Sequence, residues 1–503
     1  MSLKKLAPAL VLGCALAFVP AAAAVDFGAN DDTGKYAEDG GAVFFPQMAA
    51  AGLKQNVMTL RWLPGSTELT ETEYLDRAVP LAADSGIRVV FAVYPYPPSA
   101  IEAGLAKPAD FAAWLRALAE RYPQVTTYVV GNEPNLNTFW RAQGDGTGKV
   151  VSGASFGPFL AAGYDALKAI STELTVLGVG SSPRGERAPG PGGKASPVHF
   201  LRSLGDWYRA SRRPAPLMDG FSYHPYPNPS DFTVPFTFTY SWPNAGLHEL
   251  DRIKQALWDA FHGTPQRTTV TGLKLYLDEV GWQVDTYAFD AYTGWENVKV
   301  TTEAAQAAIY DRLVRFVVCD PDIAQLNFFG YYDERDRGGW QSALRRVDGT
   351  ERPAHAAVAA AIAATGGTCR GVPRRWKPQR QPDGAYVSFA PFKGVRARSA
   401  RWFGYVATAN EDVVVKARVV RARTPVGQVR ALLTGRGSVV NAYRRPALSH
   451  WARPAAGRMV LAVQLTARMN PSRTALFRSA PFIVEPMPPV LQRVRQPARE
   501  AHR

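Results

Sequence analysis

Two glutamates stand directly after short apolar runs, where a folded chain can bring them together. Glu133 follows Thr127-Tyr128-Val129-Val130-Gly131-Asn132, and Glu279 follows Leu275-Tyr276-Leu277-Asp278. A pair of carboxylates can cleave a glycosidic bond, with one acting as general acid and base and the other as nucleophile. At a separation of about 5–5.5 Å, such a pair works by double displacement with retention of configuration. We therefore take Glu133 and Glu279 as the candidate catalytic pair.

The segments that would position these glutamates alternate between strand and helix. The predicted strands are Val25–Ala29, Asn56–Trp62, Arg88–Tyr94, Thr126–Asn132, Leu174–Gly180, Asp219–His224, Leu273–Glu279 and Ile323–Gly330. Amphipathic segments such as 110–122, 156–172 and 302–318 lie between them. Eight strands alternating with helices predict a (β/α)8 TIM barrel at residues 25–369. A doubly wound sheet is disfavoured, because no Gly-rich turn follows the first strand. In a barrel, both glutamates lie at the rim where such folds place active sites.

The residues around these strand ends resemble a known family. Asn132-Glu133-Pro134 resembles the acid/base signature of the retaining glycoside hydrolases of clan A, which include families 5, 39 and 51, and Glu279 matches the clan's nucleophile. Arg61 resembles the arginine that supports the nucleophile, and His224 with Tyr226 resembles a His-x-Tyr pair on the sixth strand. The resemblance covers roughly residues 25–365. It implies a TIM-barrel glycosidase that acts on an oligo- or polysaccharide.

Further residues are candidates for binding the substrate. We predict that Asn132 donates to the sugar 2-hydroxyl, that Tyr226 hydrogen-bonds Glu279, and that His224 binds a sugar hydroxyl. Aromatic rings can stack on sugar faces, and the candidates at strand ends are Trp62, Tyr94, Trp282 and Tyr331. The seven histidines show no clustered metal-binding spacing, so we predict no metal and no cofactor.

The composition narrows the alternatives. Hydrophobic residues make up 46% and charged residues 20%, which excludes disordered and fibrous proteins. The chief alternative to an enzyme is a non-catalytic polysaccharide- or cell-envelope-binding protein built on the same barrel. The presence of both glutamates together with Arg61 and Asn132 argues against that alternative, since the loss of one would suffice to abolish catalysis.

The N-terminus predicts export. Residues 1–24 combine Lys4 and Lys5, an apolar stretch and a run of alanines, as in a signal peptide, so we expect a secreted, periplasmic or cell-surface protein. In an oxidising compartment Cys319 and Cys369 can pair, and two free buried thiols are the alternative.

The chain beyond residue 369 differs in charge and in pattern. Residues 370–503 hold 26 Lys and Arg against 5 Asp and Glu, whereas the rest of the chain has a net charge of −6. We predict a linker at 370–383, a basic β-sandwich at 384–490 with one strand at Gln428–Leu433, and a disordered tail at 491–503. This asymmetry favours an anionic cell-envelope polymer as partner, and a solvated basic face is the alternative. No nucleic acid is expected, because the chain carries an export signal and no recognition motif.

Overall fold

The computed structural model describes residues 24–228 and 240–486, apart from 380, 383–384, 397–401, 410, 412, 435–437, 441–446, 452–454 and 469. The predicted signal peptide, except for its last residue, and the predicted tail at 491–503 lie outside the described residues. Within the described ranges, no helix has the length and apolar character needed to cross a membrane.

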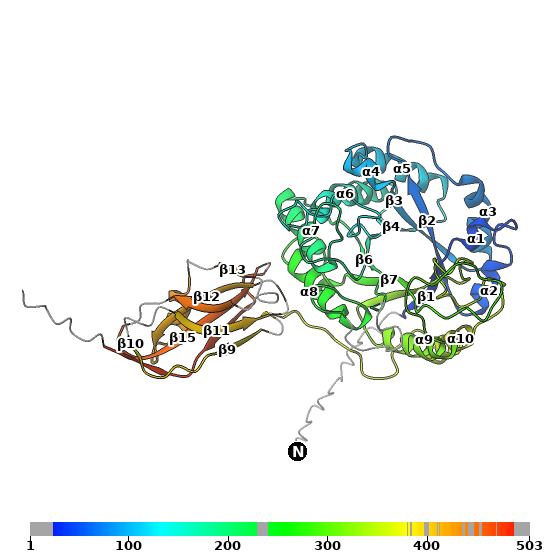
Figure 1. Cartoon of the computed structure of the whole chain (residues 1–503). Coiled ribbons are helices and arrows are strands. Elements are labelled where there is room, and N and C mark those ends of the chain that lie inside the picture. Colours follow the sequence, from blue (N-terminus) through cyan, green and yellow to red (C-terminus); the bar gives the residue numbers. More distant parts are fainter. Residues whose placement is uncertain are drawn as a thin grey trace, which may run out of the picture.

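The first domain is a closed barrel of eight parallel strands surrounded by helices (Figure 1). The strands are β1 Asp26–Asn30, β2 Gln55–Trp62, β3 Arg88–Pro95, β4 Thr127–Val130, β5 Thr175–Ser181, β6 Gly220–Tyr223, β7 Lys274–Val280 and β8 Ile323–Phe329. They follow one another around the barrel in chain order, and β1 closes the barrel by pairing with β8. The predicted TIM barrel is therefore confirmed.

Helices connect consecutive strands on the outside of the barrel. They are α1 Thr33–Tyr36, α2 Phe44–Ala50, α3 Thr72–Asp84, α4 Pro98–Glu102, α5 Pro108–Arg121, α6 Ser152–Ile170, α7 Pro197–Ser211, α8 Leu250–Phe261, α9 Glu303–Val317 and α10 Pro353–Thr365. Proline opens α5, α7 and α10, where its missing N–H costs no helical hydrogen bond. The Thr302 hydroxyl accepts from the Ala305 amide at 3.2 Å and so caps the start of α9.

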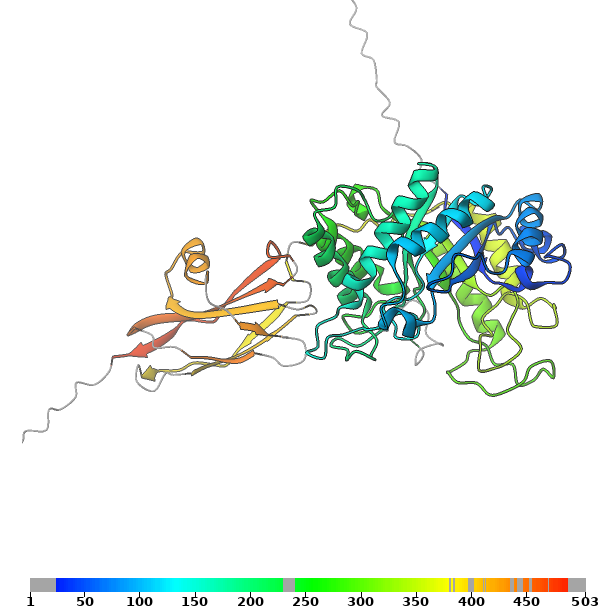
Figure 2. The same ribbon diagram turned by 90° about the horizontal axis from the view of Figure 1, so that it is seen from above.

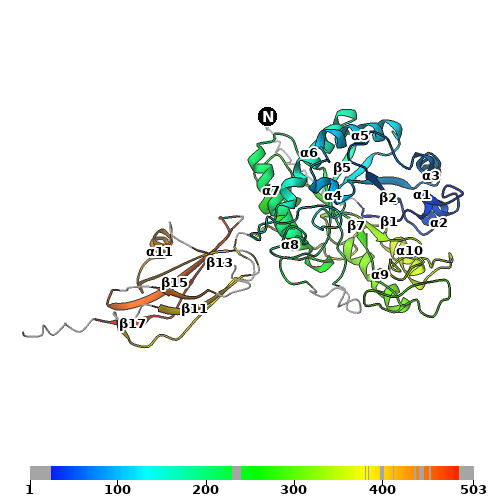
Figure 3. The same ribbon diagram turned by 45° about the horizontal axis from the view of Figure 1, so that its top comes forward.

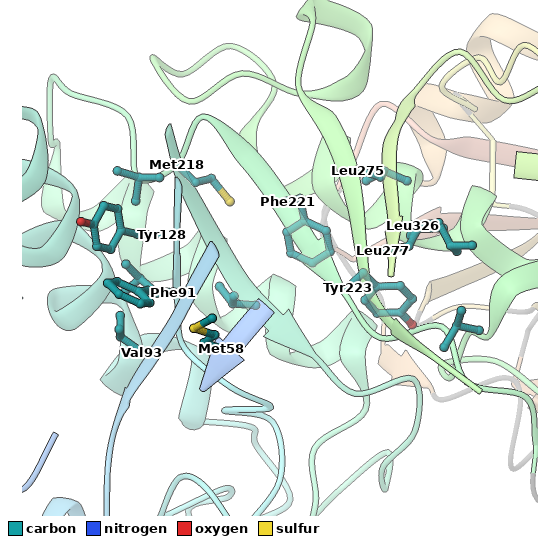
Figure 4. Close-up of a cluster of buried hydrophobic side chains, with 14 of the residues drawn as sticks. Met58, Phe91, Val93, Tyr128, Met218, Phe221, Tyr223, Leu275, Leu277 and Leu326 are labelled. Atoms are coloured by element: carbon teal, nitrogen blue, oxygen red, sulfur yellow. The ribbon is translucent and has the colours of Figure 1, made fainter. Parts of the chain in front are cut away.

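The two faces of each strand bury different apolar layers, because successive side chains in a strand point in opposite directions. Val57, Val90 and Leu177 belong to a small cluster inside the barrel. Met58 and Phe91, each next to one of these in the chain, pack instead in the layer between barrel and helices (Figure 4). The barrel is filled by side chains, so the residues at the C-terminal strand ends are the ones left to form a site.

The second domain is a β-sandwich. Its strands are β9 Tyr386–Phe389, β10 Val395–Arg396, β11 Trp402–Thr408, β12 Val413–Arg421, β13 Ser438–Val440, β14 Ala447–Trp451, β15 Gly457–Ala467, β16 Thr474–Arg478 and β17 Phe482–Glu485. One sheet has the order β10-β17-β15-β12-β13 with β16 beside β15, and the other has the order β14-β11-β9. Phe403 of the smaller sheet meets Leu461 and Phe482 of the larger sheet in one apolar core. The predicted sandwich architecture is therefore confirmed.

One predicted strand of this domain is wrong. Residues 428–433 fall within and just after helix α11, Val426–Leu432, rather than in a strand. Val429 and Leu433 are four residues apart and pack together against Val420 and Val460 on the outer face of the larger sheet. The apolar spacing fits a helix that covers this face, and a six-residue window is too short to separate it from a strand.

A disulfide joins Cys319, just after α9, to Cys369, which follows α10. It fastens the end of the barrel domain to its body across a sequence separation of 50 residues. Nearby, the Val25 amide donates to the Gly367 carbonyl at 2.8 Å, so the start and the end of the barrel domain are tied at the same place.

The sandwich lies beside α7 and α8 of the barrel (Figures 2 and 3), and a buried cluster of charges joins the two domains. Arg473 of the sandwich forms ion pairs with Asp259 of α8 at 3.0 Å and with Glu411 at 2.7 Å. Arg202 of α7 reaches Glu411 at 3.4 Å. All four residues are buried. Part of the positive charge of the second domain is thus neutralised inside the molecule.

Candidate active site

Glu133 and Glu279 converge on one nitrogen atom at the C-terminal rim of the barrel. Nδ1 of His224, which follows β6, lies 3.2 Å from Oε1 of Glu133 and 3.4 Å from Oε2 of Glu279. The distance between these two carboxylate oxygens is therefore no greater than the sum of the two distances to Nδ1. The ends of the fourth and seventh strands, which are similar in sequence, therefore place Glu133 and Glu279 in one site.

A tight turn after β4 sets the orientation of the Glu133 side chain. Gly131 has a φ of +113°, and a Cβ added there would lie 2.7 Å from the Val179 carbonyl oxygen. Glu133 itself has a φ of 42°, which is uncommon for a residue with a side chain, and its amide donates to the Gly180 carbonyl at 2.7 Å. Such backbone strain, of order 1–3 kcal/mol, persists where the surroundings impose it and is concentrated at functional sites.

Two hydrogen bonds hold the carboxylate of Glu279. Asn30, the last residue of β1, donates through Nδ2 to Oε1 at 3.1 Å. The Tyr226 hydroxyl donates to Oε2 at 3.0 Å, as predicted from the sequence. One oxygen is thus fixed from the first strand and the other from the segment that follows the sixth strand.

An irregularity in β7 brings two successive acidic side chains toward the barrel axis. Asp278 accepts from Ser222 and, at 3.0 Å, from Gln325, both on neighbouring strands of the barrel. Strict alternation would then turn Glu279 outward. The pairing of β7 with β8 shifts register between Leu277 and Val280, however, and such a shift re-aims a side chain.

The protonation states of the constellation are coupled. Burial raises the pKa of Glu279 to about 7, and the charge of Glu133 acts in the same direction, whereas His224 opposes both. Burial by itself would lower the pKa of His224, but Glu279 and Glu133 raise it to about 9. At neutral pH the imidazole is therefore protonated, so that Nδ1 donates to Glu133 and the positive charge faces Glu279. Burial also raises the pKa of Asp278, to about 6.

The two glutamates open into a cleft of about 900 Å³. Asn132, Arg61 and Tyr226 line it together with them, so these predicted binding residues share one space. Within the described part of the chain, the aromatic residues that line it are Tyr36, Tyr94, Phe139, Tyr226, Tyr240, Phe329, Tyr332 and Trp340. The rings of Tyr226 and Trp340 are 4.9 Å apart. The cleft thus combines polar groups with the flat apolar faces that sugar rings stack against.

Three predicted stacking residues do not reach the cleft. Trp62, Trp282 and Tyr331 are all buried in the layer between the barrel and its helices. Trp282 packs against Tyr310 with ring centres 6.1 Å apart. The neighbour of Tyr331, Tyr332, lines the cleft instead, because adjacent side chains leave this segment in different directions.

Two polar predictions also need correction. His224 was expected to bind a sugar hydroxyl, but it is buried beneath the two carboxylates and does not line the cleft. Arg61 was expected to support Glu279, yet no ion pair joins them among the described residues. Its Nε donates to the Tyr94 hydroxyl at 3.1 Å, and its guanidinium lies over the ring of Tyr96. The supporting groups are His224, Asn30 and Tyr226.

Sequence reasoning missed Asn30, Tyr332 and Trp340. Asn30 carried a usable signal, since it is a polar residue at the end of an apolar strand, in the same kind of position as the glutamates. Trp340 lies in the long segment between β8 and α10, where no periodicity points to the cleft. In the part of the chain that the structure describes, no group of three or more His, Cys, Asp and Glu residues is arranged to hold a metal ion.

Comparison with known proteins gives similarities of structure. No family model and no curated protein matches the sequence. A family 39 glycoside hydrolase from Bacteroides cellulosilyticus WH2 is similar at 16% identity and a TM-score of 0.46, over 80% of this chain and 74% of that one. A GH5_18 protein from Streptomyces cattleya, in complex with GlcNAc, is similar at 15% identity and a TM-score of 0.47, over 75% and 85%. A GH39 β-xylosidase from Caulobacter crescentus is similar at 13% identity and a TM-score of 0.43, over 86% and 92%.

These neighbours are glycoside hydrolases of clan A with TIM-barrel folds. Because their TM-scores lie below 0.5, these similarities carry no conclusion about this chain, whose fold and site are established from its own geometry.

Proposed function

We propose that the barrel hydrolyses O-glycosidic bonds by a retaining double displacement, with Glu279 as nucleophile and Glu133 as acid/base. The observation that carries this proposal is the convergence of both carboxylates on Nδ1 of His224 at the floor of one cleft. Paired carboxylates held this close fit the spacing of retaining enzymes better than the wider spacing that accommodates a water between them.

In the first step, ionised Glu279 attacks the anomeric carbon, while Glu133 gives its proton to the departing oxygen. Asn30, Tyr226 and protonated His224 all favour the ionised form of Glu279 by donating to it or by their charge. In the second step, Glu133 takes a proton from water, and that water releases the sugar from Glu279.

The substrate ring lies between these groups and the aromatic wall. Asn132 lines the cleft beside Glu133, and in the proposal it donates to the sugar 2-hydroxyl. Tyr94, Phe329 and Trp340 supply apolar surface for the faces of the sugar.

Hydrolysis of a panel of aryl glycosides and polysaccharides tests the activity, and proton NMR of the first product tests the mechanism. We expect the product to keep the anomeric configuration of the substrate. Inversion would contradict the assignment of Glu279 as nucleophile, even if hydrolysis is observed.

We propose in addition that the protein is exported and that its sandwich binds an anionic cell-envelope polymer. The disulfide supports an oxidising compartment. Exposed cations of the sandwich include Lys393, Arg421, Arg423, Arg430 and Arg458. Such charges attract carboxylate or phosphate polymers, and this attraction is screened over about 8–10 Å at physiological salt.

Sedimentation of the full chain with cell envelopes at low and high salt tests this binding. A variant with Arg421, Arg423 and Arg430 changed to Ser is the comparison. We expect strong retention of the unaltered protein at low salt, with loss at high salt and in the variant. If the protein sediments with the envelopes equally well at both salt concentrations and with these substitutions, the basic surface has no such role.

A further inference from the structure

The cleft has a positively charged wall next to Glu133. Arg61 lies at the end of β2, and Arg184 and Lys194 lie in the segment between β5 and α7. All three line the cleft. Glu133 follows β4, and in the order of strands around the barrel it stands between β2 and β5. Cations therefore flank the proposed acid/base on both sides.

Two of these cations have no counter-charge among the residues that the structure describes. Among the described residues, the side chains of Arg184 and Lys194 form no hydrogen bond and no ion pair, and both are exposed to solvent. Arg61 contacts the hydroxyl of Tyr94 and the ring of Tyr96, and no carboxylate of the described residues pairs with it. A recess lined by unpaired cations raises the local concentration of anions.

Nearby acids of the cleft are occupied by other groups. Asp31 accepts the backbone amides of Tyr331 and Tyr332, at 2.7 and 2.9 Å. Asp32 pairs with buried Lys35 at 3.2 Å. These carboxylates are held by local partners and do not neutralise the wall that carries Arg184 and Lys194.

The opposite half of the cleft has a different character. Around Glu279 it is lined by Trp340, Phe329 and Gln283, and by Glu334, whose side chain is exposed. A negatively charged sugar would be repelled by Glu334 on this side and attracted to the cations on the other side. The two halves therefore discriminate between neutral and anionic sugars.

Glu133 decides which half receives the leaving group, because it must contact the oxygen that departs. We propose that the half beside Glu133 binds a carboxylated sugar, a uronate, as the leaving group, with Arg184 and Lys194 holding its carboxylate. Arginine matches a carboxylate in bidentate geometry, and lysine adds a flexible point charge. This inference rests on the proposed glycosidase activity, and it names the substrate class of the same site.

The test uses oligosaccharides that contain uronates, each paired with its carboxyl-reduced, neutral counterpart. The kcat/KM of each member is measured for the unaltered protein and for a variant carrying Arg184→Ala and Lys194→Ala. We expect the unaltered protein to prefer the acidic member about ten- to hundred-fold, as hydrogen bonds to a charged group predict, and the variant to lose this preference. Arg184→Glu should reverse it in favour of the neutral member.

Two controls separate charge recognition from general damage. The first control is the ratio of kcat/KM for the acidic and the neutral member within each variant, because general damage lowers both values alike, whereas loss of the anion site lowers only the value for the acidic member. Arg116→Ala, at an exposed arginine on α5 outside the cleft lining, should leave the preference for the acidic member unchanged.

Calorimetric binding to the Glu279→Gln protein distinguishes this inference from the proposed function. In one outcome, the unaltered protein hydrolyses no substrate, while acidic oligosaccharides still bind to the Glu279→Gln protein more tightly than their reduced counterparts and lose this advantage when Arg184 is replaced. In that case the anion site stands and the proposed activity fails. If hydrolysis occurs and acidic and neutral members are bound and cleaved equally, the activity stands and this inference is overturned.

Discussion

The hydroxyl of Tyr226 donates a hydrogen bond of 3.0 Å to Oε2 of Glu279, so the segment after the sixth strand holds the carboxylate of the seventh strand. The other carboxylate oxygen accepts from Asn30 at 3.1 Å. A nucleophile held at both oxygens keeps one orientation, and that pre-organisation lowers the cost of reaching the transition state.

Glu279→Gln should reduce turnover below detection on every substrate, because the amide cannot form the covalent intermediate. The measurement is initial rate on a panel of aryl glycosides. Near-normal activity of this variant on any substrate would contradict the assignment of Glu279.

Glu133→Ala should have an effect that depends on the leaving group. A dinitrophenyl glycoside needs no proton to depart, so its first step should be nearly unaffected, whereas a methyl glycoside should lose about 100- to 10,000-fold in rate. Pre-steady-state bursts with the activated substrate report the first step by itself. Equal losses on both substrates would show that Glu133 is not the acid.

The pH profile should depend on His224. With the pKa of Glu279 at about 7, the ionised nucleophile is lost as pH falls, so kcat/KM should show an acid limb near pH 7. The charge of His224 lowers this pKa, and His224→Gln removes that charge. The acid limb of the variant should therefore move to higher pH. Tyr226→Phe should move it in the same direction, and a limb that stays or falls would contradict the coupling.

Arg473→Ala should weaken the junction between the domains. Its guanidinium neutralises Asp259 and Glu411, and the substitution leaves these carboxylates without that charge while they stay buried. Breaking a buried ion pair in this way costs about 3–5 kcal/mol. Urea unfolding followed by tryptophan fluorescence should show a lower midpoint or a separate early transition. Arg458→Ala, at an exposed arginine of the same domain, is the matched control and should change neither.

Replacing Cys319 and Cys369 together by Ser should lower the free energy of unfolding of the barrel domain by about 2–4 kcal/mol, because the bond closes a long loop. Thermal unfolding of the protein with and without reductant gives the same comparison without substitution. Thiol titration of the purified protein under denaturing, non-reducing conditions should find neither cysteine free.

The strand pattern could be read from the sequence because hydrophobic periodicity is a local property. Each of the eight barrel strands was predicted near its observed bounds, and Glu133 and Glu279 were placed at the rim from strand ends alone. The sandwich followed from the same signal, although its strands β10, β14 and β16 were not predicted. Helix α11 shows the limit of the signal, because a short apolar run does not reveal that Val429 and Leu433 cover a sheet face.

The direction of individual side chains was decided by tertiary structure. The register shift in β7 turns Glu279 inward beside Asp278, and adjacent Tyr331 and Tyr332 end in the core and in the cleft. Asn30 and Glu279 are 249 residues apart in the chain, yet one hydrogen bond joins them. Sequence determined which elements form and which residue types stand at their ends, because those depend on neighbours in the chain. Which of these residues meet depends on barrel closure and packing between distant segments, which no local pattern records.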